Sequence, residues 1–274
     1  MGDGAKIICP NHLCQAPNPE SNRFCQQCRT PVPKRYLWAV GAGIEAYKPG
    51  KIFTERYLYK RDRILLDTKP GFIPSFPTEI PDEILPYLRL FPHRLHVPQV
   101  YGELILKKSK GEPIWLLEQA PIWTNRKNQT SMLMPELGVA WKDAPAIRQL
   151  NWLWQIAQLW QPFSQIGVAS SLVEPKLLRV EGQIVRLLEL KLDRTEISLT
   201  DLGATWRYLV KDAKPHIAEF FAALCEQIIQ GEILPEELLA QLEQALLTVG
   251  VEQTRTYQIA TPVSYTHLTL PTIL

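Results

Sequence analysis

The chain has 274 residues, of which 46% are hydrophobic and 21% are charged. These proportions are those of an average globular protein that can bury a core, with room for one or two domains and an appendage. The formal net charge of +2 is too small to create the basic field that favours nucleic-acid binding.

The N-terminus and the apolar stretches give no sign of a membrane protein. The opening residues, MGDGAKIICPNH, lack the apolar region of a secretory signal, and Lys6 stands where N-myristoylation requires Ser or Thr. The most apolar stretch, Leu150–Val168, is interrupted by glutamines and by Pro162, so it is not a membrane span. We therefore expect a cytoplasmic protein.

Four of the five cysteines lie in the first 28 residues, with the spacing Cys-x4-Cys-x10-Cys-x2-Cys. Structural zinc takes four ligands at the corners of a tetrahedron, and paired cysteines at such spacings supply them. We predict that Cys9, Cys14, Cys25 and Cys28 bind one structural zinc ion and that residues 1–33 form a zinc ribbon.

The small size of this segment decides how it folds. It buries too little surface to fold alone, so metal binding would supply its folding free energy. We expect Asn18 and Pro19 to turn the chain between the two cysteine pairs and Phe24 to provide the apolar side chain of the miniature core. His12 is interpreted as a solvated loop residue and Cys225 as a buried thiol in a helix.

Two other interpretations of the cysteines compete with zinc. Two disulfides are typical of a secreted protein, and the missing secretory signal weakens that interpretation. A redox Cys-x-x-Cys needs a strand and a helix around Cys25, and the sequence shows no such frame.

Residues 34–125 are predicted to form mostly strands and one helix. Apolar runs at Arg63–Lys69 and Ile114–Gln119 predict strands. Between them, Pro81–Leu95 has apolar residues at helical spacing, and Val97–Gly102 returns to a strand. The last predicted strand ends in a proline-containing hinge, and this order of elements resembles that of a protein-kinase small lobe.

Residues 126–250 are predicted to form a helical large lobe. Three amphipathic helices are expected, at Pro145–Phe163, Pro215–Gln230 and Pro235–Leu247. The tryptophans are interpreted as core residues. The inner face of the first helix is expected to consist of Leu150, Leu153, Ile156, Ala157 and Trp160.

The segment after the first of these helices completes the comparison with a kinase. Gly167–Val180 aligns without a gap with a kinase catalytic loop, and Glu181 begins a hairpin turn into a strand at Ile184–Lys191. The predicted fold class is therefore α+β, with an N-terminal zinc ribbon followed by a shortened, two-lobed, kinase-like domain whose C-terminal lobe is helical.

The catalytic positions of that frame do not carry kinase chemistry. Phosphoryl transfer needs a catalytic-loop Asp, an Asn for the second metal and an Asp that holds magnesium. Leu172, Leu177 and Glu189 occupy those places, and leucine neither binds magnesium nor accepts a proton. Lys69 stands where a nucleotide-binding lysine would, but a solvated turn lysine explains it equally well because Val40–Gly43 is only half of a glycine-rich loop.

Several longer stretches accompany the four-cysteine prefix, which is closely followed by KRYLWAVG at Lys34–Gly41. They are LDTKPG at Leu66–Gly71, RLHVPQVYG at Arg94–Gly102, RQLNWLWQIAQLWQP at Arg148–Pro162 and LLRVEGQIVRLL at Leu177–Leu188. Together, over residues 9–261, these features resemble the N-terminal region of cyanobacterial metal-dependent serine/threonine phosphatases of type 2C.

The resemblance implies that a phosphatase domain follows, with two Mg²⁺ or Mn²⁺ ions held by its own aspartates. Residues 251–261 would then be a linker and the start of that domain. Residues Pro262–Thr272 read PVSYTHLTLPT, which resembles the translation of a sequencing adapter. We therefore expect residues 262–274 to be a foreign tail and the natural protein to continue past Thr261.

The leading hypothesis is a non-catalytic regulatory or protein-interaction module, a zinc ribbon plus pseudokinase, of a phosphatase that acts on phosphoserine and phosphothreonine. Its expected partner is a phosphoprotein or another signalling protein. One alternative is an unusual active kinase that uses Glu189 and Lys69. Another is nucleic-acid binding through the ribbon, which we do not expect because its basic residues are few and lack interleaved aromatic residues. Those residues are Lys6, Arg23, Arg29, Lys34 and Arg35.

Overall fold

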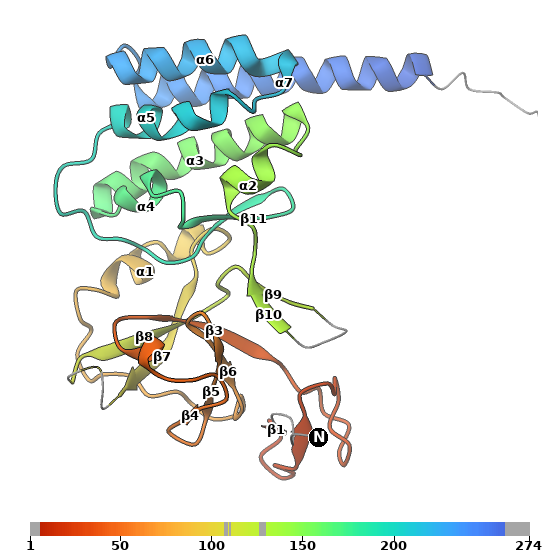
Figure 1. Ribbon diagram of the computed structural model, residues 1–274, viewed down its shortest axis with the longest axis vertical. Helices are drawn as coiled ribbons and strands as arrows, with labels where there is room; N and C mark the ends of the chain where they lie inside the picture. The colour runs from red at the N-terminus through yellow and green to blue at the C-terminus, as the bar shows by residue number, and fades with distance from the viewer. Residues whose placement is uncertain (1–5, 107–108, 110, 126–129, 261–274) are drawn as a thin grey trace, which may run out of the picture.

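The computed structural model of the protein describes residues 6–106, 109, 111–125 and 130–260. They form an antiparallel sheet, a stack of helices and a small N-terminal ribbon, so the mixed α+β class is confirmed. Figure 1 shows the helices in one half of the molecule, the sheet below them and the ribbon at the far end of the sheet. The predicted tail lies outside the described residues.

The ribbon contains two short strands, β1 (Lys6–Ile8) and β2 (Pro17–Pro19), which pair in antiparallel fashion. A single bridge between Phe24 and Pro31 closes its second half. The predicted turn at Asn18 is displaced, because that residue lies within β2 and the turn follows the strand.

Six strands form one sheet in the order β4-β5-β6-β3-β8-β7, with every pair antiparallel. They are β3 (Arg35–Val40), β4 (Ile52–Phe53), β5 (Tyr57–Arg61), β6 (Ile64–Asp67), β7 (Gln99–Ile105) and β8 (Pro113–Glu118). The three predicted strands correspond to β6, β7 and β8. The central strands are buried on both faces, which explains their continuous apolar runs.

The two faces of the sheet belong to different cores, because successive side chains of a strand point to opposite sides. Trp38, Ile64 and Leu117 face the helices and join the large core that the helices form. Leu37 and Leu65 face the other way, into a smaller core made by the sheet and its loops. The sheet is therefore the layer that connects the helices with the rest of the molecule.

The helix predicted over Pro81–Leu95 is much shorter than expected. Only Leu85–Arg89 is α-helical (α1), and a 3₁₀ turn (η2) follows at Phe91–His93. Pro92 lacks a backbone N–H and its ring clashes with the preceding turn, so the α-helix ends before it. Leu88, one of the apolar residues at helical spacing, remains 46% exposed.

Two hairpins and six helices make up the rest of the chain that the structure describes. They are β9 (Ile122–Asn125), β10 (Thr130–Leu133), α2 (Leu137–Trp141), α3 (Ala146–Ile166), α4 (Ser170–Val173), β11 (Leu178–Glu181), β12 (Ile184–Leu187), α5 (Leu199–Val210), α6 (Pro215–Gln230) and α7 (Pro235–Ala260). The bounds of α6 match the prediction, because Pro215 occupies its first turn and Gly231 ends it with a φ of 71°. The hairpin turn predicted after Glu181 joins β11 to β12.

The core of the helical half is built around α3 and aromatic rings. The predicted inner face of α3 is buried in full: Leu150, Leu153, Ile156, Ala157 and Trp160. Trp141 and Trp206 both contact the ring of Phe221, at centroid separations of 5.5 and 6.3 Å. Trp152 and Trp206 are core residues as predicted, whereas Trp154 is half-buried and its indole N–H donates to Glu243.

Helix α7 is longer than the predicted Pro235–Leu247 and continues to Ala260. Residues 251–260, expected to be a linker and a first strand, are thus helical, and Figure 1 shows them extending past the end of α6. No helix in the described part of the chain has both the length and the apolar character that a membrane span requires.

Candidate metal centre

The two loops that carry the cysteines close in the same way. In each loop, the N–H of the first cysteine donates to the carbonyl two residues beyond the second cysteine: Cys9 to Ala16 (2.9 Å) and Cys25 to Thr30 (2.8 Å). The residue directly after the second cysteine has a positive φ in both loops, 47° and 62°. This shared geometry curls each loop around its own pair of sulfur atoms.

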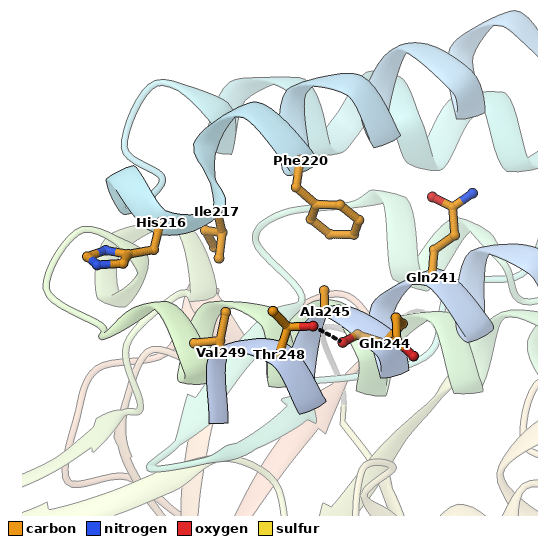
Figure 2. Close-up of a pocket in the computed structure, with 8 residues that line it drawn as sticks. All are labelled: His216, Ile217, Phe220, Gln241, Gln244, Ala245, Thr248 and Val249. Carbon is orange, nitrogen blue, oxygen red and sulfur yellow. Dashed lines mark hydrogen bonds between the residues drawn. The ribbon is translucent and has the colours of Figure 1, made fainter. Parts of the chain in front are cut away.

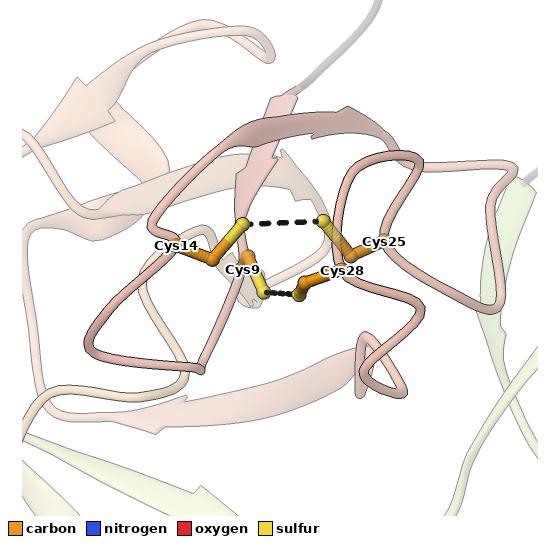
Figure 3. Close-up of side chains that lie close together, drawn as sticks. All are labelled: Cys9, Cys14, Cys25 and Cys28. Carbon is orange, nitrogen blue, oxygen red and sulfur yellow. Dashed lines mark hydrogen bonds between the residues drawn. The ribbon is translucent and has the colours of Figure 1, made fainter.

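The four predicted ligands come together at one point. All four sulfur atoms lie within 4.8 Å of one another, with Cys9 and Cys28 3.5 Å apart and Cys14 and Cys25 3.7 Å apart. Four sulfurs at 2.3 Å from a tetrahedral zinc would be about 3.8 Å from each other. Figure 3 shows the side chains pointing toward a common centre from the two loops.

These distances distinguish a metal site from a disulfide. All five cysteines are free, and a disulfide would bring two sulfurs to about 2.05 Å. Among the described residues, no second group of three or more metal-binding side chains converges in this way. The four-cysteine cluster is therefore compatible with structural zinc, as predicted from the spacing.

Backbone donors and burial divide the thiols into two kinds. The N–H groups of Cys28 and Gln27, against the opposing effect of burial, lower the pKa of Cys25 to about 6. The hydroxyl and N–H of Thr30 lower the pKa of Cys28. Burial raises the pKa of Cys9 to about 12. Zinc binds thiolates, so the charge of the ion would have to offset the burial of Cys9.

A buried amide connects the two loops beside the sulfurs. Asn18 is fully buried, and its side-chain N–H donates to the carbonyl of Ala16 (2.8 Å) in the first loop. Its side-chain oxygen accepts the N–H of Gln26 (2.9 Å) in the second loop. His12 is exposed and lies outside the cluster, as expected for a solvated loop residue.

A scan of the sequence against protein-family models finds no match. A search of the curated proteins finds no match either. The assignment of the metal centre therefore depends on the cysteine spacing and on the arrangement of the sulfur atoms.

The prediction that Phe24 forms the ribbon's core is wrong. Its side chain is 54% exposed, because the bridge to Pro31 turns it away from the cysteines. The ribbon core consists instead of Ile7, Cys9, Ala16, Cys25 and Val32, together with Leu66 from strand β6 of the sheet. The ribbon is thus packed onto the sheet, and part of its core belongs to another element.

Polar contacts fix the same interface. The Tyr36 hydroxyl donates to Glu20 (2.6 Å), and the Lys60 ammonium forms an ion pair with the second oxygen of that carboxylate (2.9 Å). Burial and the Glu20 carboxylate both raise the pKa of Tyr36, so the phenol stays protonated. The Glu20 carboxylate is nearly inaccessible to solvent, and a buried charge needs partners of this kind.

Lys69, proposed from the sequence as a nucleotide contact, follows strand β6 at the surface. Its ammonium lies 4.0 Å from Glu55, whose side chain is 93% exposed. An active kinase pairs its nucleotide-binding lysine with a glutamate on a helix. Glu55 lies in the turn between β4 and β5 instead.

The residues aligned with kinase catalytic positions make structural contacts. Leu172 is fully buried in the large core, and Leu177 packs against that core. The Glu189 carboxylate accepts a hydrogen bond from the Trp38 indole N–H (2.6 Å) and lies 3.9 Å from the Arg63 guanidinium. Glu189 therefore joins the helical half to the sheet.

The basic residues around the ribbon do not act as one group. The guanidinium of Arg35 lies over the ring of Tyr101 and 3.9 Å from Glu118, so Arg35 already has partners within the molecule. Arg23 and Arg29 are exposed on the ribbon. This distribution gives nucleic-acid binding no additional support.

A buried ionic network beside the ribbon was not predicted from the sequence. Asp67 is fully buried and accepts two hydrogen bonds from the guanidinium of Arg56 (2.9 and 2.8 Å) and one from the Tyr101 hydroxyl (2.5 Å). The available signal in the sequence was Asp67 itself, an acidic residue at the end of the apolar run that forms β6. A charge there is retained only when it is paired.

A groove of about 340 Å³ lies at the opposite end of the molecule, between α6 and α7. Figure 2 shows Phe220, Ile217 and Ala245 on its walls and Gln241 and His216 toward its ends. Its polar groups do not converge on one point, so it does not have the arrangement of a catalytic site.

Proposed function

We propose that this protein is a zinc-stabilised, non-catalytic interaction module in which a ribbon is attached to a degenerate, kinase-like domain. It would act in the cytoplasm on a phosphoprotein or another signalling protein. The resemblance to the N-terminal region of type 2C phosphatases supports a role beside a phosphatase domain that carries its own Mg²⁺ or Mn²⁺ ions.

The observation that carries the non-catalytic part is the burial of Leu172. In an active kinase the aligned residue is an aspartate that accepts the proton of the substrate hydroxyl, which requires contact with the substrate. Leu172 is fully buried among apolar side chains and has no group that accepts a proton. Glu189 also supports a non-catalytic role, because its carboxylate already accepts a hydrogen bond from the Trp38 indole.

The competing function is that of an unusual kinase in which Glu189 holds a metal ion and Lys69 contacts the nucleotide. Incubation of the protein with Mg²⁺ and ATP labelled at the γ-phosphate separates the two functions. We expect no label on the chain or on an added generic substrate. Labelling that disappears in Lys69→Ala but persists in Lys48→Ala, a control on an exposed loop, would overturn the proposal.

The phosphatase association is tested separately, by reading the coding sequence of the natural gene past codon 261. We expect codons for a domain with several metal-binding aspartates. A coding sequence without such a domain would remove the phosphatase from the proposal and leave the zinc module unaffected.

A further inference from the structure

The segment Phe72–Phe76, which follows strand β6, exposes apolar side chains although its backbone is fixed. Ile73 is 91% exposed and Phe76 is 52% exposed. Clustered apolar side chains on a surface are unfavourable in water and indicate that the segment is held in place by other contacts. Two sets of contacts hold this segment, and a third set holds Thr68 and Gly71 just before it.

The first set comes from the buried ionic network. The guanidinium of Arg56 donates to the carbonyls of Phe72 (2.8 Å) and Ile73 (3.0 Å). The same guanidinium forms the bidentate pair with the buried Asp67. Two carbonyls of the segment are thereby attached to a group that cannot leave the sheet without exposing a charge pair.

The second set comes from the edge of the sheet. The N–H of Glu103, on edge strand β7, donates to the carbonyl of Ser75 (2.9 Å). Pro74 rests on Gly102, where an added Cβ would come within 2.8 Å of the proline ring. The segment therefore covers part of an edge strand that would otherwise offer its N–H groups to another chain.

The third set comes from the first cysteine loop. The N–H of Ile8 donates to the carbonyl of Thr68 (2.7 Å), and the main chain of Pro10 lies directly against Gly71. A Cβ added to Gly71 would lie 2.7 Å from Pro10 Cα and 2.8 Å from its carbonyl oxygen. These contacts adjoin Cys9, so they depend on the loop that the metal would organise.

We propose that metal occupancy of the four-cysteine centre controls the position of the Phe72–Phe76 segment. With metal, the first cysteine loop is ordered and the backbone of Pro10 packs against Gly71. Without metal, the ribbon is too small to keep its fold, so the contacts from Ile8 and Pro10 are lost. Release of Gly71 then loosens the segment that follows it: Arg56 still holds Phe72 and Ile73, but the Ser75 carbonyl leaves the N–H of Glu103 more often. This inference depends on metal binding and not on the comparison with kinases.

Residue-resolved amide exchange by NMR tests this proposal on the full chain. It compares protein loaded with one equivalent of Zn²⁺ with protein stripped by a chelator. We expect the amides of Glu103 and Phe72 to exchange at least about tenfold faster without metal, because the first donates to Ser75 in the segment and the second donates to Lys69, two residues before Gly71. The amide of Leu153, in the middle of α3, should exchange at the same rate in both states.

Two results would overturn the proposal. Equal exchange at Glu103 in both states would show that the metal centre does not hold the segment. Faster exchange at Leu153 as well would show that the whole chain unfolds rather than the segment alone. Absence of bound zinc after loading would refute the metal centre itself, which distinguishes that failure from a failure of the coupling.

A glycine substitution tests the route of the coupling. In Gly71→Ala the new methyl group meets the Pro10 backbone, so we expect fast exchange at Glu103 even with one zinc bound. The control is Gly250→Ala in α7, where an added Cβ has no neighbour within 4 Å. Gly250→Ala should leave exchange at Glu103 unchanged. Equal exchange in Gly71→Ala and the wild type would overturn the route through Pro10.

Discussion

The ribbon and the helical half of this protein reach a stable fold by different means. The ribbon core contains a few small or medium side chains and borrows Leu66 from the sheet. The core of the helical half contains the buried face of α3 and fully buried rings such as Trp152 and Phe221. The first region has little apolar surface, so a metal ion in its cysteine cluster would supply the missing folding free energy, whereas the second has enough apolar surface to fold by burial.

A single substitution is therefore expected to have a different effect on stability in each region. In the helical half, removing one methyl group removes only a small fraction of the apolar contacts that stabilise the core. In the ribbon, each cysteine is one of only four candidate metal ligands, so its loss would disrupt the whole centre. Substitutions should therefore affect the two regions separately, and four predictions test that separation.

The largest effect is expected from Cys25→Ser. Metal binding in small zinc domains contributes about 10–16 kcal/mol, so loss of one ligand should leave the ribbon unfolded. The zinc content, measured by metal analysis, should fall from about one ion per chain toward zero. The helical circular dichroism signal should be unchanged, because the helical half stays folded. Cys225→Ser is the matched control, because this buried thiol lies in α6 and should leave the zinc content unchanged.

A large effect on the other region is expected from Leu153→Ala. Leu153 is fully buried, and such truncations lower the free energy of unfolding by about 2–5 kcal/mol. Urea unfolding followed by tryptophan fluorescence measures the change. Leu247→Ala, at a position that is 65% exposed, should change it by less than about 0.5 kcal/mol. Loss of zinc in folded Leu153→Ala would contradict the separation of the two regions.

A moderate effect is expected where the sheet meets the helical half. Trp38 donates to the Glu189 carboxylate across this boundary, and a hydrogen bond to a charged group contributes about 1.5–3 kcal/mol. A double-mutant cycle with Trp38→Phe and Glu189→Gln should give a coupling of about 1 kcal/mol, since Glu189 is partly exposed. A coupling near zero would mean that the two halves are joined by apolar packing alone.

The smallest effect concerns pH. Burial lowers the pKa of His96, whose Nδ1 lies 2.8 Å from the carbonyl of Val185. Between this lowered value and about 6.5, the unfolded chain binds the proton and the folded chain does not. Stability is therefore fully present above about pH 6.5 and falls as the pH drops toward the folded pKa.

His96→Gln should flatten this part of the pH profile, measured as urea midpoints between pH 7 and pH 5. His12→Gln, at an exposed position, should leave the profile as it is in the wild type. A profile that flattens equally in both variants would assign the effect to general charge rather than to the buried ring.

The sequence predicted local features well. The metal ligands could be found because zinc chemistry demands particular residues at short spacings, and the four cysteines do converge. The bounds of α6 could be found because Pro215 and Gly231 mark them. The inner face of α3 could be found from its helical period.

Features set by distant partners could not be predicted. Phe24 was expected in the ribbon core, but Leu66 of the sheet takes that role, and spacing within the first 33 residues gives no hint of it. The pairing of Arg56 with Asp67 depends on the register of β5 and β6, which places the two side chains together. A single sequence offers no covariation from which to infer such contacts.

The hydrogen bond from Ile8 to Thr68 joins residues about sixty positions apart in the chain. A ribosome adding about 5–20 residues per second needs roughly 3–12 s to make the intervening segment. The last of the four cysteines, Cys28, is synthesised 40 residues before Thr68, so about 2–8 s pass between completion of the cysteine set and synthesis of Thr68. During this time the nascent ribbon has no sheet to pack against, so capture of a metal ion by the four cysteines would order it. The ordered ribbon would then provide a preformed surface on which Leu66 of strand β6 packs as it emerges.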